Sequence, residues 1–92
     1  MAFLTKEERD ALLDEIKDLP FNQIKGRVRG KDKKSRLAYY RNVQESGKWM
    51  TRYVLPSLGT MVTLVETLET NDNKTHYRLT EIIVQPTPDN RL

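Results

Sequence analysis

The chain has 92 residues, of which 37% are hydrophobic and 32% are charged, and its formal net charge is +3. A chain of this length has room for one modest core, so residues 1–92 are expected to form a single domain. The absence of cysteine excludes disulfides and thiolate metal sites, and it suits a reducing compartment, so a cytoplasmic location is expected. No stretch approaches the roughly 20 apolar residues of a membrane span, and no membrane partner is expected.

The first predicted element is a helix over residues 6–19. Thr5 followed by Glu8 has the spacing of a capping box, in which side chain and backbone satisfy each other's hydrogen bonds at a helix start. Apolar residues then repeat at helical spacing, and Pro20 is expected to end the helix. These apolar residues are Leu12, Leu13, Ile16 and Leu19.

The rest of the chain predicts five short antiparallel strands joined by tight turns. Residues 24–29 alternate between Ile24 or Val28 and basic side chains, which is the period of a strand. The other predicted strands are residues 36–43, 48–55, 60–68 and 75–84, with 60–68 in the centre because it is apolar on both faces. Residues 85–92, with two prolines, are expected to form a flexible tail. The predicted fold is α+β, an N-terminal helix followed by about five antiparallel β-strands in a curled sheet or small β-barrel.

The sequence contains no group of residues with the spacing that catalysis requires. His76 is the single histidine, and it has no cysteine or spaced partner with which to bind a metal or activate a nucleophile. Glu66 and Glu69 are three apart on a predicted strand, so they face opposite sides and cannot act as an acid-base pair. The sequence therefore predicts a binding protein rather than an enzyme, with no cofactor and no metal site.

One segment concentrates the positive charge. Residues 20–52 hold ten basic side chains against two acidic ones, and aromatic residues lie among them. Basic residues on an outward strand face also serve simply to solvate it and to protect a sheet edge, and this alternative stays open. The residues predicted to bind nucleic acid are Lys25, Arg27, Arg29, Lys31, Lys33, Lys34, Arg36, Tyr40, Trp49, Arg52 and Tyr53.

Strand register decides the role of the aromatic residues. If residues 44–47 form the loop of a hairpin, Val43 faces Lys48, and the rings of Tyr40, Trp49 and Tyr53 share one exposed face on which unpaired bases can stack. A slip of one residue sends Trp49 and Tyr53 into the core instead, which is the ordinary place for strand aromatics. Both alternatives remain open from the sequence.

The leading functional prediction is a module that binds RNA or single-stranded DNA, with lysine and arginine on phosphates and aromatic rings on bases. The alternative is a protein-interaction module or small regulatory subunit that docks an acidic protein partner. A homodimer formed through sheet edges is also expected to be accessible, because an open sheet leaves two edges unpaired.

Overall fold

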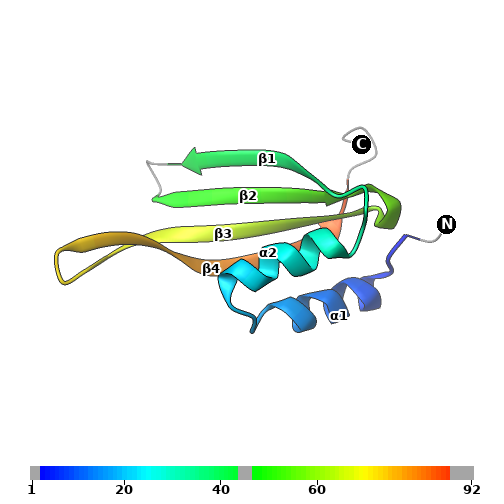
Figure 1. Cartoon of the computed structure of the whole chain (residues 1–92), viewed down its shortest axis with the longest axis horizontal. Coiled ribbons are helices and arrows are strands. Elements are labelled where there is room, and N and C mark those ends of the chain that lie inside the picture. Colours follow the sequence, from blue (N-terminus) through cyan, green and yellow to red (C-terminus); the bar gives the residue numbers. More distant parts are fainter. Residues whose placement is uncertain (1–2, 44–46, 88–92) are drawn as a thin grey trace.

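The computed structural model describes residues 3–43 and 47–87, except for the side chains of residues 38–43. Two helices are followed by a four-stranded antiparallel sheet, which makes an α+β fold (Figure 1). The strand order β1-β2-β3-β4 pairs each strand with its neighbour in sequence, and the sheet remains open. The elements are α1 (Lys6–Ile16), α2 (Phe21–Gly30), β1 (Arg36–Val43), β2 (Lys48–Leu55), the 3₁₀ turn η2 (Pro56–Leu58), β3 (Thr60–Asn71) and β4 (Lys74–Pro86).

The predicted first helix is confirmed, with a different end. The Thr5 side chain accepts a hydrogen bond from the Glu8 N–H (3.2 Å), and the Glu8 carboxylate accepts one from the Thr5 N–H (3.0 Å). The helix ends at Ile16 rather than at Leu19. A residue that precedes proline is disfavoured in helical conformation, and Pro20 instead begins the next helix, where its carbonyl accepts from the Ile24 N–H (3.0 Å).

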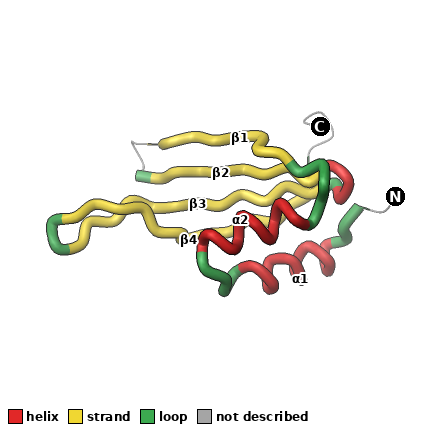
Figure 2. The backbone as a smooth tube through the Cα atoms, in the orientation of Figure 1, coloured by secondary structure: helices red, strands yellow, loops and turns green. Residues whose placement is uncertain are grey.

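The predicted strand over residues 24–29 is wrong, because these residues belong to α2. Ile24 and Val28 are four apart, so their spacing fits one face of a helix as well as it fits a strand. Both are fully buried, whereas Gly26 between them is exposed. The chain therefore has four strands instead of five, and the open sheet replaces the predicted barrel, because both helices cover one face of it (Figure 2).

The core lies between the two helices and the sheet. α1 packs along β4 and α2 along β2, so that the helices lie side by side over the sheet. Burial of one aliphatic side chain contributes about 1.5–3 kcal/mol, so each helix is held mainly by its two buried residues. The buried residues of this cluster are Leu12, Ile16, Ile24, Val28, Tyr53, Leu55, Val62 and Leu64.

The strand pairing follows the prediction closely in the middle of the sheet. Val43 lies opposite Lys48 and Asn42 opposite Trp49, as the hairpin over residues 44–47 requires. β3 pairs on both sides and is an interior strand, as predicted. β4 continues through Pro86, beyond the expected start of the tail, and the Thr87 N–H donates to the Gly59 carbonyl (2.9 Å). Residues 88–92 of the predicted tail lie outside the described residues.

β3 and β4 extend past β1 and β2 as a two-stranded ribbon (Figure 2). Its turn places Asp72 and Asn73 at φ of 53° and 65°, a backbone conformation that these two residue types tolerate. At the other end of the sheet, the Leu4 N–H donates to the Leu58 carbonyl (3.0 Å), which ties the N-terminal segment to η2. In the described part of the chain, neither helix is long and apolar enough to cross a membrane.

Candidate nucleic-acid interface

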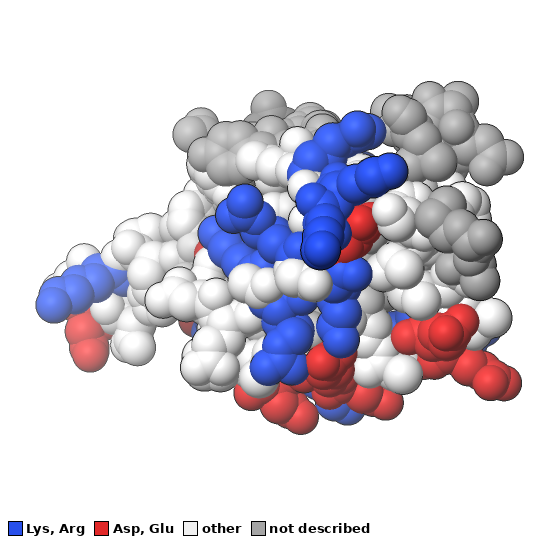
Figure 3. Space-filling view, turned by 45° about the vertical axis from the view of Figure 1, so that its right-hand side comes forward, with Lys and Arg blue, Asp and Glu red and all other residues white. Residues whose placement is uncertain are grey.

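Seven basic residues between positions 25 and 36 come together on one side of the molecule. They lie on α2, on the loop that follows it and at the start of β1. Figure 3 shows basic side chains gathered over this region, with acidic side chains along the border formed by α1. We refer to this set as the cationic surface: Lys25, Arg27, Arg29, Lys31, Lys33, Lys34 and Arg36.

Because α2 is a helix, these cations do not share the single face that a strand would give them. Residues four apart lie on the same side of a helix, so Lys25 and Arg29 occupy one flank of α2. Arg27 lies on the opposite flank. Lys31, the C-cap residue, is four residues after Arg27 and lies on the same flank. The two flanks have different electrostatic surroundings.

The flank with Arg27 and Lys31 faces α1 and is paired with Glu15. The Arg27 Nη1 atom lies 2.9 Å from Glu15 Oε1, and the Lys31 Nζ atom lies 2.7 Å from Glu15 Oε2. The hydrogen bond from Lys31, followed by that from Arg27, lowers the pKa of the Glu15 carboxyl below its usual value. Glu15 therefore stays ionised and neutralises part of this flank.

The remaining five cations form no ion pair of this kind, although the Lys34 charge interacts at longer range with the Asp32 carboxylate. Among the described side chains, no carboxylate forms an ion pair with Lys25, Arg29, Lys33, Lys34 or Arg36. The Lys25 ammonium lies 4.8 Å from the centre of the Phe21 ring, which supports its stem without neutralising its charge. These five residues make up the part of the cationic surface that can bind an external anion.

Asp32 holds the loop between α2 and β1 in place. Asp32 is only 6% exposed. Its Oδ1 atom accepts a hydrogen bond from the Lys34 N–H (3.0 Å), and its Oδ2 atom accepts one from the Ser57 N–H (2.8 Å). Burial raises the pKa of Asp32, but the hydrogen bonds from Lys34 and Ser57, together with the positive charge of Lys34, outweigh it and hold the pKa below its usual value. An ionised carboxylate thus joins the loop to η2.

Sequence reasoning did not identify Glu15 or Asp32 as part of this surface. An aspartate two residues before a backbone N–H is a known turn signal, so the local bond to Lys34 could have been expected. The bond to Ser57, and the pairing of Glu15 with α2, join residues that are distant in sequence. No local sequence pattern predicts contacts between residues so far apart in the chain.

The aromatic residues do not form the exposed platform. Tyr53 is 7% exposed and belongs to the core, although the register slip that was expected to bury it does not occur. Trp49 is half-buried and contacts Tyr77 edge-to-face, with ring centroids 6.0 Å apart. The register is the one that the exposed platform required, but the helices cover the face on which these rings lie. The Tyr40 side chain lies outside the described residues.

Arg52 lies on the opposite side of the sheet from Tyr53, because successive strand residues alternate between faces. Its Nε atom donates to the Thr63 hydroxyl (3.1 Å). Arg52 therefore lies on the other face of the sheet from Trp49 and Tyr53. Of the predicted site residues, the structure brings together those between positions 25 and 36.

Two of the residues considered for catalysis, Glu69 and His76, lie opposite each other on the β3–β4 ribbon, a pairing that the sequence did not predict. Glu69 accepts from Arg78 Nε (2.6 Å), and His76 Nε2 lies 3.9 Å from its other oxygen, half-exposed on β4. Glu66 lies opposite Leu79 on β4, and since it is three residues from Glu69 on β3, the two side chains face opposite sides of the sheet, as predicted. Across residues 3–43 and 47–87, histidine and acidic side chains form no group of three that could hold a metal ion.

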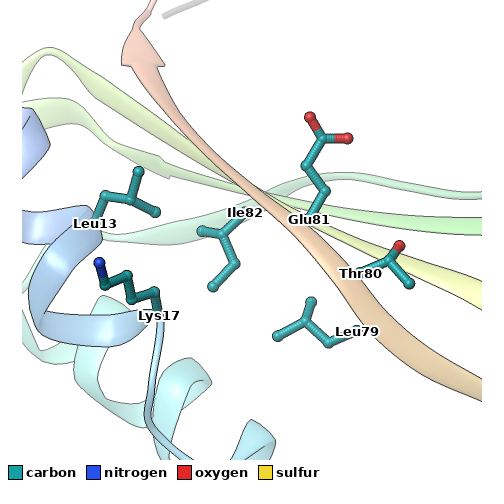
Figure 4. A pocket seen from close by; sticks show the side chains of 6 residues that line it. All are labelled: Leu13, Lys17, Leu79, Thr80, Glu81 and Ile82. Carbon is teal, nitrogen blue, oxygen red and sulfur yellow. The ribbon is translucent and has the colours of Figure 1, made fainter.

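A small cavity lies between α1 and β4 (Figure 4). Its volume of about 210 Å³ is below the range of roughly 300–1,000 Å³ that is typical of sites for drug-sized ligands. The Lys17 ammonium at its edge is paired with Asp14 (3.2 Å). The lining residues are Leu13, Lys17, Leu79, Thr80, Glu81 and Ile82.

Comparison with known proteins found no protein-family model, no curated protein and no solved structure that matches this chain.

Proposed function

We propose that the chain is a non-enzymatic module that binds the phosphate backbone of nucleic acid through its cationic surface. The observation that supports this proposal most directly is the group of five basic side chains that form no ion pair with a described carboxylate. Lysine and arginine on such a surface release the counterions of nucleic acid, and this release supplies most of the affinity of non-specific binding. The five residues proposed to contact phosphates are Lys25, Arg29, Lys33, Lys34 and Arg36.

The interface is proposed to bind backbones with little preference for base sequence. Stacking on bases needs an accessible ring, and Tyr53 is buried while Trp49 packs on Tyr77. The sequence-based preference for single strands depended on an aromatic platform and on the absence of a basic helix. α2 is a basic helix, so neither reason favours single strands over duplexes, and the experiment compares the two directly.

Fluorescence anisotropy with labelled 20-nucleotide single-stranded DNA, single-stranded RNA and duplex DNA tests this function. Binding is expected in about 20–50 mM salt, with affinity that falls steeply as salt rises. Five phosphate contacts predict a slope of log affinity against log salt of about −3.5 for a single strand and about −4.5 for a duplex. Lys74→Gln in the β3–β4 turn is the matched control and should leave the slope unchanged.

Absence of binding to all three probes at the lowest salt would contradict the proposal. A slope near zero would contradict it as well, because it would mean that phosphate contacts do not contribute. Equal slopes for sequences of different composition are expected, since backbone contacts carry no sequence information.

A second candidate function is docking of an acidic protein partner, and Leu37 is the observation that favours it. Leu37 is 54% exposed and lies beside Arg36 at the start of β1, which is an edge strand. An edge strand presents unpaired backbone groups to which another chain can add, and a partner paired there would cover Leu37. A stoichiometric complex that survives nuclease treatment and is weakened by Leu37→Ser would support this function, whereas nucleic-acid binding should be insensitive to that change.

A further inference from the structure

The loop from Lys31 to Ser35 is held by hydrogen bonds on both of its sides. Asp32 binds the Lys34 N–H (3.0 Å) and the Ser57 N–H (2.8 Å) through its two carboxylate oxygens. Its carbonyl also accepts from the Ser35 N–H (2.9 Å). The Ser35 hydroxyl in turn donates to the carbonyl of Arg29 (2.9 Å) at the end of α2. These bonds connect the loop to α2 and to η2.

The loop places two exposed cations between two others. Lys33 and Lys34 lie on the loop itself, Arg29 precedes it on α2, and Arg36 follows it on β1. All four belong to the unpaired part of the cationic surface. Flexible side chains lose conformational entropy when they are ordered by a ligand, so a backbone that is already fixed reduces the cost of binding.

Asp32 is an unexpected residue for a surface that binds anions. Its negative charge opposes the approach of a phosphate, and by charge alone its removal should improve binding. The carboxylate is buried, however, and both of its oxygens are occupied by backbone N–H groups. Its structural contribution and its electrostatic contribution to binding therefore have opposite signs.

We propose that Asp32 is the positioning residue of a phosphate-binding site formed by Arg29, Lys33, Lys34 and Arg36. The ligand is a phosphodiester of a nucleic-acid backbone, and the inference rests on the proposed function. Asp32 does not touch the ligand, and it acts by holding the loop in the conformation that presents both lysines to neighbouring phosphates.

Glu15 provides a control with the same charge and a different role. It is exposed at the border of the same surface and forms ion pairs with both Arg27 and Lys31, whose two charges it neutralises in part. Glu15→Gln and Asp32→Asn each remove one negative charge from the cationic surface. If charge alone matters, both variants bind more tightly than the wild type.

The two variants are expected to change affinity in opposite directions. Each phosphate contact with a single strand adds about 0.7 to the slope of log affinity against log salt. If affinities at 1 M salt are taken as equal, one contact fewer therefore lowers the affinity at about 50 mM salt nearly tenfold. Glu15→Gln frees two cations and should tighten binding several-fold with a steeper slope. Asp32→Asn replaces one acceptor oxygen by an amide that faces an N–H donor, and it should weaken binding about tenfold with a slope shallower by about 0.7.

Binding and urea unfolding are measured on the same samples, at a temperature where both variants are fully folded. Loss of stability alone leaves the salt slope of the folded protein unchanged, so a shallower slope reports lost phosphate contacts. If Asp32→Asn does not fold, Ser35→Ala removes the bond to Arg29 without changing any charge. It should weaken binding two- to threefold, and unchanged binding by Ser35→Ala would then overturn the proposal.

If Asp32→Asn binds more tightly than the wild type, as Glu15→Gln is expected to, Asp32 acts only through its charge. That result would overturn the positioning role and leave the proposed function intact. Failure of the wild type to bind any nucleic acid at low salt would overturn both. The two failures are therefore distinguishable.

Discussion

The division of the α2 cations into two flanks can be tested with a matched pair of double variants. Lys25→Gln/Arg29→Gln neutralises the unpaired flank, and Arg27→Gln/Lys31→Gln neutralises the flank that is paired with Glu15. Each double variant removes one lysine and one arginine, four residues apart. Because the change in net charge is identical, any difference in binding arises from where the charges lie.

The structure sets the expected sizes. Loss of two phosphate contacts makes the single-strand slope shallower by about 1.4, which corresponds to a loss of affinity of about 60-fold at 50 mM salt relative to 1 M. That loss is expected for Lys25→Gln/Arg29→Gln. Arg27 and Lys31 are already engaged by Glu15, so their neutralisation should cost less than about fivefold and change the slope little.

Anisotropy titrations from about 20 to 300 mM salt give both the affinity and the slope. Circular dichroism on the same samples confirms that both variants keep their helices. Equal losses for the two double variants would refute the reasoning, because they would show that only total charge matters and that pairing with Glu15 does not set the binding residues apart.

Three further changes test the packing and the electrostatics. Ile16→Ala should lower the free energy of unfolding in urea by about 3 kcal/mol, because Ile16 is fully buried and the change removes three carbons from the core. Leu13 is half-buried, so Leu13→Ala should lower it by about 1 kcal/mol, and equal losses would mean that α1 docks in another orientation. Trp49→Ala should lower the free energy of unfolding by about 1–2 kcal/mol, because the contact with Tyr77 is lost, and it should leave the affinity for single strands unchanged. A loss of affinity without a loss of stability would instead indicate base stacking. The interactions that lower the pKa of Asp32 stabilise the fold above the unfolded pKa of about 3.9, and this stabilisation is lost as pH falls through the folded pKa. The wild type should therefore lose stability on acidification more steeply than Asp32→Asn, and parallel profiles would show that folding does not lower the pKa of Asp32.

Several elements of the fold were predictable because their signals are local. The capping box of Thr5 and Glu8 marks the start of α1, and both the hairpin of β1 with β2 and the turn at Asp72 and Asn73 follow from residues adjacent in sequence. α2 was assigned to the wrong class for a local reason as well. In a run as short as residues 24–29, Ile24 and Val28 satisfy the period of a strand and that of a helix equally, and only packing on the sheet separates the two.

The candidate site shows the same division. Positive charge is concentrated between residues 20 and 52, and this could be predicted because charge follows directly from residue type. Which of these charges are available to a ligand depends on how the helices pack. Glu15 reaches Arg27 and Lys31 because α1 folds back beside α2, and Tyr53 is removed from solvent because both helices cover its face of the sheet. Ion pairing and burial depend on distances between segments that are remote along the chain, and those distances exist only once the helices have packed on the sheet.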